Sequence, residues 1–291
     1  MKVGAVDIGT NSMRLLITDA GTEIGRWVAV TGLGRGVDTT GALSPEGIEE
    51  SLVALAHFGE IMEAEGVERR MAIATSAARD ASNRELFFDL AQTALSVRPN
   101  LVSGEVEARL AYAGATAGVH LPQPIVVSDI GGGSTEFVTR DGAESIDIGS
   151  VRLTERAIPS RPSPSAEMEK ARSLIADLFR EVRLETRTLI GVAGTWTSLD
   201  AIAQGLPETS RDSVHGHRMT RGELVSLIDF LSGKTEAETA AIPSLDPKRA
   251  PVILAGALIA EGVMDVLGRE EVLVSEHDTL DGVALELLAL P

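Results

Sequence analysis

The sequence repeats a short motif at an interval of 122 residues. Asp7-Ile8-Gly9 aligns with Asp129-Ile130-Gly131, and Ser12 aligns with Ser134. In both copies an apolar segment leads into the motif, a small polar turn follows it, and a second apolar segment comes next. A chain with 29 glycines produces one such motif easily by chance, but two in the same context favour a duplicated domain. The repeat therefore predicts two similar halves, each opening with a β-hairpin.

The segment Leu121-Pro122-Gln123-Pro124 lies between the two copies, and proline-rich segments of this kind mark boundaries. We predict an N-terminal domain over residues 1–122 and a C-terminal domain over 123–280. A terminal helix over 281–291 is expected to pack back on the first domain. Predicted strands and helices alternate after each hairpin, which favours two α/β domains over one doubly wound sheet.

Helix starts are recognisable from their capping residues. Glu223 follows Thr220 at the spacing of a capping box. Apolar stretches predict a long buried helix over 248–267 and a last helix over 282–290. Hydroxyl side chains are expected to cap three helices, at Ser44, Ser165 and Thr220.

Composition limits the partners of the chain. Its 43 acidic and 26 basic residues give a net charge of −17, which disfavours non-specific binding of nucleic acid. Aromatic residues are 3% of the sequence, too few for stacking on single-stranded nucleic acid. There is no cysteine and no apolar run of about 18 residues. We therefore predict a cytoplasmic protein with neither a nucleic-acid partner nor a membrane span.

The two repeated turns have the composition of phosphate-binding loops. Small residues let a phosphate approach the backbone N–H groups, and hydroxyl groups add further donors. Such local donors are what an acidic chain needs if its substrate is a polyanion. The candidate phosphate-binding residues of the two turns are Thr10, Asn11, Ser12, Gly131, Gly132, Gly133, Ser134 and Thr135.

Carboxylates flank both turns. Asp7 and Asp129 stand at the ends of their predicted strands, and Glu136 follows the second turn. Carboxylate oxygens hold Mg²⁺ directly or through water, commonly beside a substrate phosphate. The sequence therefore predicts a metal site for Mg²⁺, or alternatively Mn²⁺, with Asp7, Asp129 and Glu136 as candidate ligands.

Further segments extend these motifs over almost the whole chain. In chain order, the informative segments are 6–14, 74–83, 102–109, 128–136, 149–155, 194–195, 214–216, 254–256 and 274–282. Together they resemble the exopolyphosphatase/guanosine pentaphosphate phosphatase (Ppx/GppA) family in its short, two-domain form. That resemblance implies two actin-like (ribonuclease H-like) α/β domains of the sugar kinase, chaperone and actin superfamily around a central cleft. It also suggests a homodimer.

The resemblance also implies roles for single residues. Glu107 matches the glutamate that activates or positions the attacking water, and Asp129 matches a second catalytic carboxylate. Arg14 and Arg79 match positions that face substrate phosphates, where a guanidinium offsets developing charge. The resemblance also adds Gly194 and Thr195 to the candidate phosphate-binding residues.

Three positions depart from the pattern of the family. Thr10 stands where serine is usual, and its hydroxyl group is retained. Val106 replaces a second acid beside Glu107, which reduces the negative charge there. Pro251 replaces an acid in an Arg-Ala-x-Val-Ile-Leu-Ala-Gly run, and a proline is tolerated in a first helical turn.

The resemblance favours an Mg²⁺-dependent exopolyphosphatase that releases orthophosphate from the terminal phosphoanhydride of polyphosphate. The first alternative keeps the chemistry but takes guanosine pentaphosphate or another nucleotide. A second is an acetate- or sugar-type kinase, although Gly191-Val192-Ala193-Gly194-Thr195 is weak support for an adenosine site. A third is a non-catalytic sensor of nucleotide or polyphosphate, against which the retention of Glu107 and Asp129 weighs.

Overall fold

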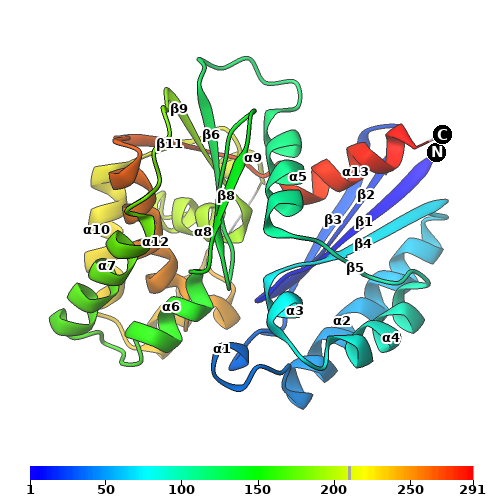
Figure 1. Cartoon of the computed structure of the whole chain (residues 1–291), viewed down its shortest axis with the longest axis horizontal. Coiled ribbons are helices and arrows are strands. Elements are labelled where there is room, and N and C mark those ends of the chain that lie inside the picture. Colours follow the sequence, from blue (N-terminus) through cyan, green and yellow to red (C-terminus); the bar gives the residue numbers. More distant parts are fainter. Residues whose placement is uncertain (209–210, 291) are drawn as a thin grey trace. The chain divides into compact units, whose positions relative to one another are not determined.

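The protein is described by a computed structural model that covers residues 1–208 and 211–290. The chain forms two compact units: unit 1 comprises Met1–Gly114 and the C-terminal segment from Asp278, and unit 2 comprises Ala115–His277. Each unit contains one mixed sheet with helices packed on it (Figure 1), which confirms the α/β fold class. Within the described residues, no helix combines the length and apolar character needed to cross a membrane.

The sheet of unit 1 has the strand order β3-β2-β1-β4-β5. β1 pairs antiparallel with β2 and parallel with β4. Alternate side chains of β1 enter different apolar clusters, Val3 and Ala5 on one face and Val6 and Ile8 on the other. The strands are β1 (Lys2–Ile8), β2 (Ser12–Asp19), β3 (Thr22–Val30), β4 (Arg69–Ala74) and β5 (Asn100–Leu101).

Helices cover both faces of this sheet (Figure 1). α2 and α4 pack on the face that carries Val6 and Ile8, and α5 and α13 pack on the opposite face. The C-terminal helix α13 lies against β1. The helices of this part of the chain are α1 (Val37–Thr40), α2 (Pro45–Ala64), α3 (Ser76–Asp80), α4 (Arg84–Leu95), α5 (Gly104–Thr116) and α13 (Thr279–Ala289).

The sheet of unit 2 has the order β10-β11-β9-β6-β7-β8 and is packed around one large apolar cluster that includes Phe137, Trp196 and Leu254. Its strands are β6 (Ile125–Ile130), β7 (Thr135–Val138), β8 (Ala143–Ile146), β9 (Thr188–Val192), β10 (Arg218–Thr220) and β11 (Glu271–Val274). Its helices are α6 (Ser150–Ala157), α7 (Ser165–Phe179), α8 (Ala193–Ala203), α9 (Arg211–Val214), α10 (Arg221–Ser232), α11 (Glu236–Ala240) and α12 (Ile253–Val266), with a 3₁₀ turn at Pro247–Arg249.

The two sheets open in the same way. β1 and β2 form an antiparallel hairpin in which the N–H of Gly9 donates to the carbonyl of Ser12 at 3.0 Å. β6 and β7 form the equivalent hairpin, and Gly131 donates to Ser134, also at 3.0 Å. The first strand of each hairpin also pairs in parallel with a later strand, β1 with β4 and β6 with β9. The predicted β-hairpin at the start of each half is therefore confirmed.

Two of the three predicted helix caps are confirmed. Ser44 accepts from the N–H of Gly47, and Thr220 forms the capping box with Glu223. The expected cap at Ser165 is wrong, because that residue is already the first of α7 and the N-cap is Pro164, which has no side-chain donor or acceptor.

The predicted helix over 248–267 begins later than expected. A 3₁₀ turn ends at Arg249, and α12 begins only at Ile253. Pro251 explains the break, because it has no N–H to donate to the preceding turn. This proline marks the start of α12 rather than sitting within its first turn.

Glycine allows a close crossing of α5 and α13 in unit 1. A Cβ on Gly282 would collide with the backbone carbonyl of Leu110, which cannot move away as a flexible side chain could. We expect Gly282→Ala to lower the free energy of unfolding by about 1–3 kcal/mol. Gly222→Ala in α10 is the control, because a Cβ there meets nothing within 4 Å and alanine favours a helix. Thermal unfolding compares the two, and an unchanged midpoint for Gly282→Ala would contradict this packing.

Candidate functional site

The turn between β1 and β2 is held in place by its own carbonyl groups. The carbonyl of Thr10 accepts from the N–H of Gly34 at 2.7 Å, and that of Asn11 accepts from the N–H groups of residues 31 and 32 at 3.0 Å each. The hydroxyl of Thr10 accepts from the N–H of Ala77 at the start of α3. These contacts with residues 31–34 and with the start of α3 fix the conformation of the turn.

Asp7 and Arg14 face each other across the β1–β2 ladder. Oδ2 of Asp7 accepts from Nε of Arg14 at 3.0 Å and from Nη2 at 2.5 Å. The other carboxylate oxygen, Oδ1, is buried and has no hydrogen-bond partner. Burial raises the pKa of Asp7, and Arg14 opposes that effect. Arg14 therefore neutralises one oxygen of this carboxylate, and the second oxygen remains to be satisfied.

Glu107 is paired with Arg79. Glu107 lies in the first turn of α5, Arg79 lies in the last turn of α3, and Nη1 of Arg79 is 2.8 Å from Oε2 of Glu107. The same nitrogen donates to the carbonyl of Val102 at 3.0 Å, which anchors the guanidinium. Burial raises the pKa of Glu107 and Arg79 opposes it, while the charges of Asp7 and Arg14 also act on this carboxyl. The four side chains thus form one electrostatic cluster in unit 1.

The turn between β6 and β7 in unit 2 is fixed by the first N–H groups of α6. Ser150 donates to the carbonyl of Gly131 at 2.9 Å, and the N–H groups of Val151 and Arg152 donate to the carbonyl of Gly132. The first N–H groups of a helix have no partner within the helix itself. This glycine turn supplies acceptors for them and is held close to the helix in return.

The carboxylates of unit 2 lie across one ladder. Asp129 on β6 pairs with Glu136 on β7, and their exposed fractions are 5% and 1%. Glu136 accepts a hydrogen bond from the hydroxyl of Ser145 at 2.8 Å. The hydroxyl of Thr135 donates to the carbonyl of Ile148, so it stabilises the turn by a hydrogen bond within unit 2.

The segment at Gly194 and Thr195 is helical. The structure places both residues in the first turn of α8, directly after β9. The hydroxyl of Thr195 donates to the carbonyl of Ile130 at the end of β6. A Cβ on Gly194 would meet the guanidinium of Arg249, so this arginine lies against the start of α8. Arg249 opens the Arg-Ala-x-Val-Ile-Leu-Ala-Gly run of the sequence, but that run did not indicate this contact.

The residues present fit a magnesium ion. Within residues 1–208 and 211–290, no three His, Asp or Glu side chains form a cluster suited to a metal ion. Magnesium does not require one, because one or two carboxylates together with water and substrate phosphates often suffice. Asp7, with its unpartnered Oδ1, provides such a carboxylate in unit 1. Asp129 and Glu136 provide a paired set in unit 2.

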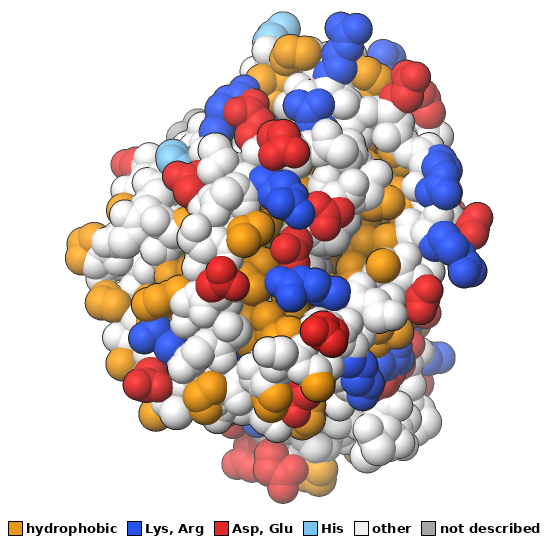
Figure 2. Space-filling view, turned by 90° about the vertical axis from the view of Figure 1, so that its left-hand side faces the viewer, with side chains coloured by type: hydrophobic (Ala, Val, Ile, Leu, Met, Phe, Trp, Pro, Cys, Tyr) orange, Lys and Arg blue, Asp and Glu red, His pale blue; other side chains and the backbone are white. Residues whose placement is uncertain are grey.

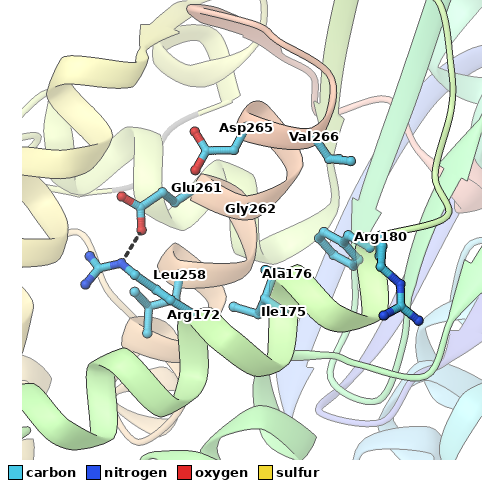
Figure 3. Close-up of a pocket in the computed structure, with 10 residues that line it drawn as sticks. Arg172, Ile175, Ala176, Arg180, Leu258, Glu261, Gly262, Asp265 and Val266 are labelled. Atoms are coloured by element: carbon cyan, nitrogen blue, oxygen red, sulfur yellow. Dashed lines mark hydrogen bonds and ion pairs between the residues drawn. The ribbon is translucent and has the colours of Figure 1, made fainter.

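A groove in unit 2 is unrelated to these residues. Figure 3 shows it between α7 and α12, with Arg172 and Glu261 paired at 2.8 Å on its edge. Its volume is about 420 Å³, and apolar side chains such as Ile175, Phe179 and Leu258 line it. On the face drawn in Figure 2, hydrophobic side chains lie in hollows among charges of both signs. No predicted site residue lines this groove.

Comparison with known proteins shows the family. The Ppx/GppA phosphatase family matches residues 20–290. The chain belongs to this family. It is 38% identical to the exopolyphosphatase 2 of Mycobacterium tuberculosis, and the alignment covers 98% of both proteins.

Solved Ppx/GppA structures agree with this assignment. A crystal structure of an exopolyphosphatase-like protein superimposes with a TM-score of 0.93 at 34% identity, covering 98% of both chains. A Ppx/GppA family member from Aquifex aeolicus superimposes with a TM-score of 0.82 at 29% identity, covering 98% of this chain and 97% of that one.

One departure from the pattern of the Ppx/GppA family has a structural explanation. Val106 packs against the apolar cluster that joins α5 and α13 to the sheet of unit 1. An acid at this position would lie against that apolar cluster, whereas valine adds to it.

The pairing of Arg79 with Glu107 predicts a pH effect. Arg79→Met removes the charge that lowers the pKa of Glu107, so this pKa rises further. A base acts only when it is ionised, so the acid limb of kcat/KM for phosphatase activity should move to higher pH. Arg98→Met is the control, because Arg98 pairs with Glu85 and Asp89 on the surface. An acid limb that stays in place or moves to lower pH would contradict the prediction.

Proposed function

We propose that this protein is an exopolyphosphatase, in which water attacks the terminal phosphorus of polyphosphate and releases orthophosphate. The observation that carries the proposal is the carboxylate of Glu107, only 13% exposed and paired with Arg79 in the same cluster as Asp7. The names of two relatives support the choice of substrate, exopolyphosphatase 2 and the exopolyphosphatase-like protein.

Glu107 is the proposed general base. Burial raises its pKa, so its carboxylate is more basic than an exposed one and accepts a proton from water more readily. Arg79 opposes that rise, because its positive charge favours the ionised form of the carboxyl. Arg79 also fixes one carboxylate oxygen at 2.8 Å, so the side chain is oriented before the substrate binds.

The turns supply the contacts to the phosphate chain. We expect N–H groups and hydroxyls of residues 10–12 and 132–134 to act as neutral donors, which suit a polyanion in a chain with a net charge of −17. We propose that the carboxylate of Asp7 in unit 1 and those of Asp129 and Glu136 in unit 2 are ligands for Mg²⁺. An ion bound to such a carboxylate would neutralise phosphate oxygens as charge develops on them.

The direct test is orthophosphate release with Mg²⁺ from polyphosphates of defined length, compared with guanosine pentaphosphate and ATP. Release from polyphosphate in preference to both nucleotides is expected. Preference for guanosine pentaphosphate would contradict the proposed substrate but keep the phosphatase chemistry. Phosphate transfer to an acceptor other than water would contradict hydrolysis itself.

The role of Glu107 is tested by Glu107→Gln. The amide keeps the size of the side chain but cannot accept the proton of water, so kcat should fall by roughly 10²–10⁴-fold. Binding of polyphosphate, measured by calorimetry, should be largely retained. Glu105→Gln is the matched control on the same helix turn, because Glu105 is exposed and its activity should equal that of the wild type. Near-normal turnover of Glu107→Gln would remove Glu107 from the catalytic role.

A further inference from the structure

Arg14 in unit 1 contacts a second carboxylate in addition to that of Asp7. Oδ2 of Asp278, the N-cap residue of α13, accepts a hydrogen bond from Nη1 of Arg14. Its other oxygen, Oδ1, caps the helix by accepting from the N–H of Leu280 at 2.9 Å. One carboxylate therefore fixes both the start of α13 and the guanidinium that holds Asp7.

Arg26 of β3 supports Asp278. Its Nη1 lies 3.7 Å from Oδ1 of Asp278, and its Nη2 lies 2.9 Å from both carboxylate oxygens of Asp281. Asp281 in turn accepts from the N–H of Asp278 at 2.8 Å. The side chains of Arg26 and Asp278 are only 12% and 6% exposed, so salt screens these pairs weakly.

The backbone of Asp278 is also confined. A Cβ on Gly114 of α5 would collide with the carbonyl of Asp278, so α5 packs directly on the start of α13. Glu107 lies on the same helix α5. The position of Asp278 is therefore fixed against the element that carries the proposed base.

The charges in this network do not cancel. Four carboxylates, those of Asp7, Glu23, Asp278 and Asp281, pair with two guanidinium groups, those of Arg14 and Arg26. With all of them ionised, two negative charges remain. Arg14 occupies Oδ2 of Asp7 and leaves the buried Oδ1 without a hydrogen bond. The oxygen that lacks a partner thus belongs to a cluster with an excess of negative charge. Such an environment favours the binding of a cation.

We propose that Asp278 and Arg26 are positioning residues: they hold Arg14, and through it Asp7, so that Oδ1 of Asp7 is presented to Mg²⁺. This inference rests on the proposed function and assigns a role to two residues that lie outside both repeated turns. It also changes the expected role of Arg14, which orients a carboxylate here and is held by two acids. Mutation of a group that orients a metal ligand in this way typically lowers metal affinity or activity by 10–100-fold.

The test uses Asp278→Asn and Asp278→Ser, which keep a side-chain oxygen for the helix cap but lose the charge. Both should lower kcat by about 10–100-fold and raise the half-saturating Mg²⁺ concentration by about 10-fold or more. KM for polyphosphate should stay close to that of the wild type. Asp246→Asn, at the N-cap of the 3₁₀ turn in unit 2, is the control and should change none of these.

Coupling to Arg14 is the second measurement. If Asp278 acts through Arg14, adding Asp278→Asn to Arg14→Lys should lower kcat no further than Arg14→Lys alone. The inference would be overturned if the losses of kcat from the two substitutions multiplied in the double variant. It would also be overturned if kcat and the Mg²⁺ requirement were unchanged in both Asp278 variants. A raised KM at constant kcat would also overturn it, because it would place Asp278 in substrate binding.

The inference can be separated from the proposed function. If the wild-type protein releases no orthophosphate from polyphosphate, the proposed function fails. Mn²⁺ binding to the substrate-free protein, followed by electron paramagnetic resonance, then decides the inference alone. Weaker binding by Asp278→Asn than by the wild type would support it, and equal binding would overturn it.

Discussion

A buried carboxylate is costly unless a cation or a set of donors lies against it, and unit 1 places two such groups in one cluster. Asp7 is paired with Arg14 and Glu107 with Arg79, and burial raises the pKa of both acids. The rest of unit 1 can be understood as the support for these pairs. Residues such as Val106, Gly114 and Gly282 pack α5 and α13 tightly, so the charged side chains have fixed partners.

The duplicated hairpin gives each unit the same framework with different chemistry. The same hydrogen bond closes both turns, from Gly9 to Ser12 and from Gly131 to Ser134. The residue that faces the aspartate across the ladder differs, because Arg14 faces Asp7 whereas Glu136 faces Asp129. Unit 1 therefore pairs its aspartate with a cation, and unit 2 pairs its aspartate with a second acid. The two hairpins thus share a backbone arrangement and differ in the side chain that faces the aspartate.

Local features of the fold were predictable from the sequence, and long-range contacts were not. The hairpins, the cap at Ser44 and the capping box at Thr220 depend on neighbouring residues, and all are present. The cap at Ser165 and the start of α12 were wrong, because Pro164 and Pro251 alter the local hydrogen bonding. Short helices such as α3 are built mainly by tertiary contacts, and periodicity does not reveal them in so few residues.

The site was predictable only in part for the same reason. Asp7 and Asp129 follow apolar strands in a repeated motif, so their strand-end positions could be inferred. The pairing of Arg14 with Asp278 joins residues from opposite ends of the chain, and no local pattern indicates it. Arg249 against Gly194 is a similar case. The roles in catalysis and metal binding remain predictions for experiment.

The central claim is that a water molecule attacks the terminal phosphorus of polyphosphate. Its most direct test is a single turnover in ¹⁸O-labelled water, with mass analysis of the orthophosphate and of the shortened chain. The account predicts that each released orthophosphate carries one solvent oxygen and that the shortened chain carries none. Label in the shortened chain would mean attack at another phosphorus atom, and orthophosphate without label would mean that water is not the acceptor; either result would contradict the account.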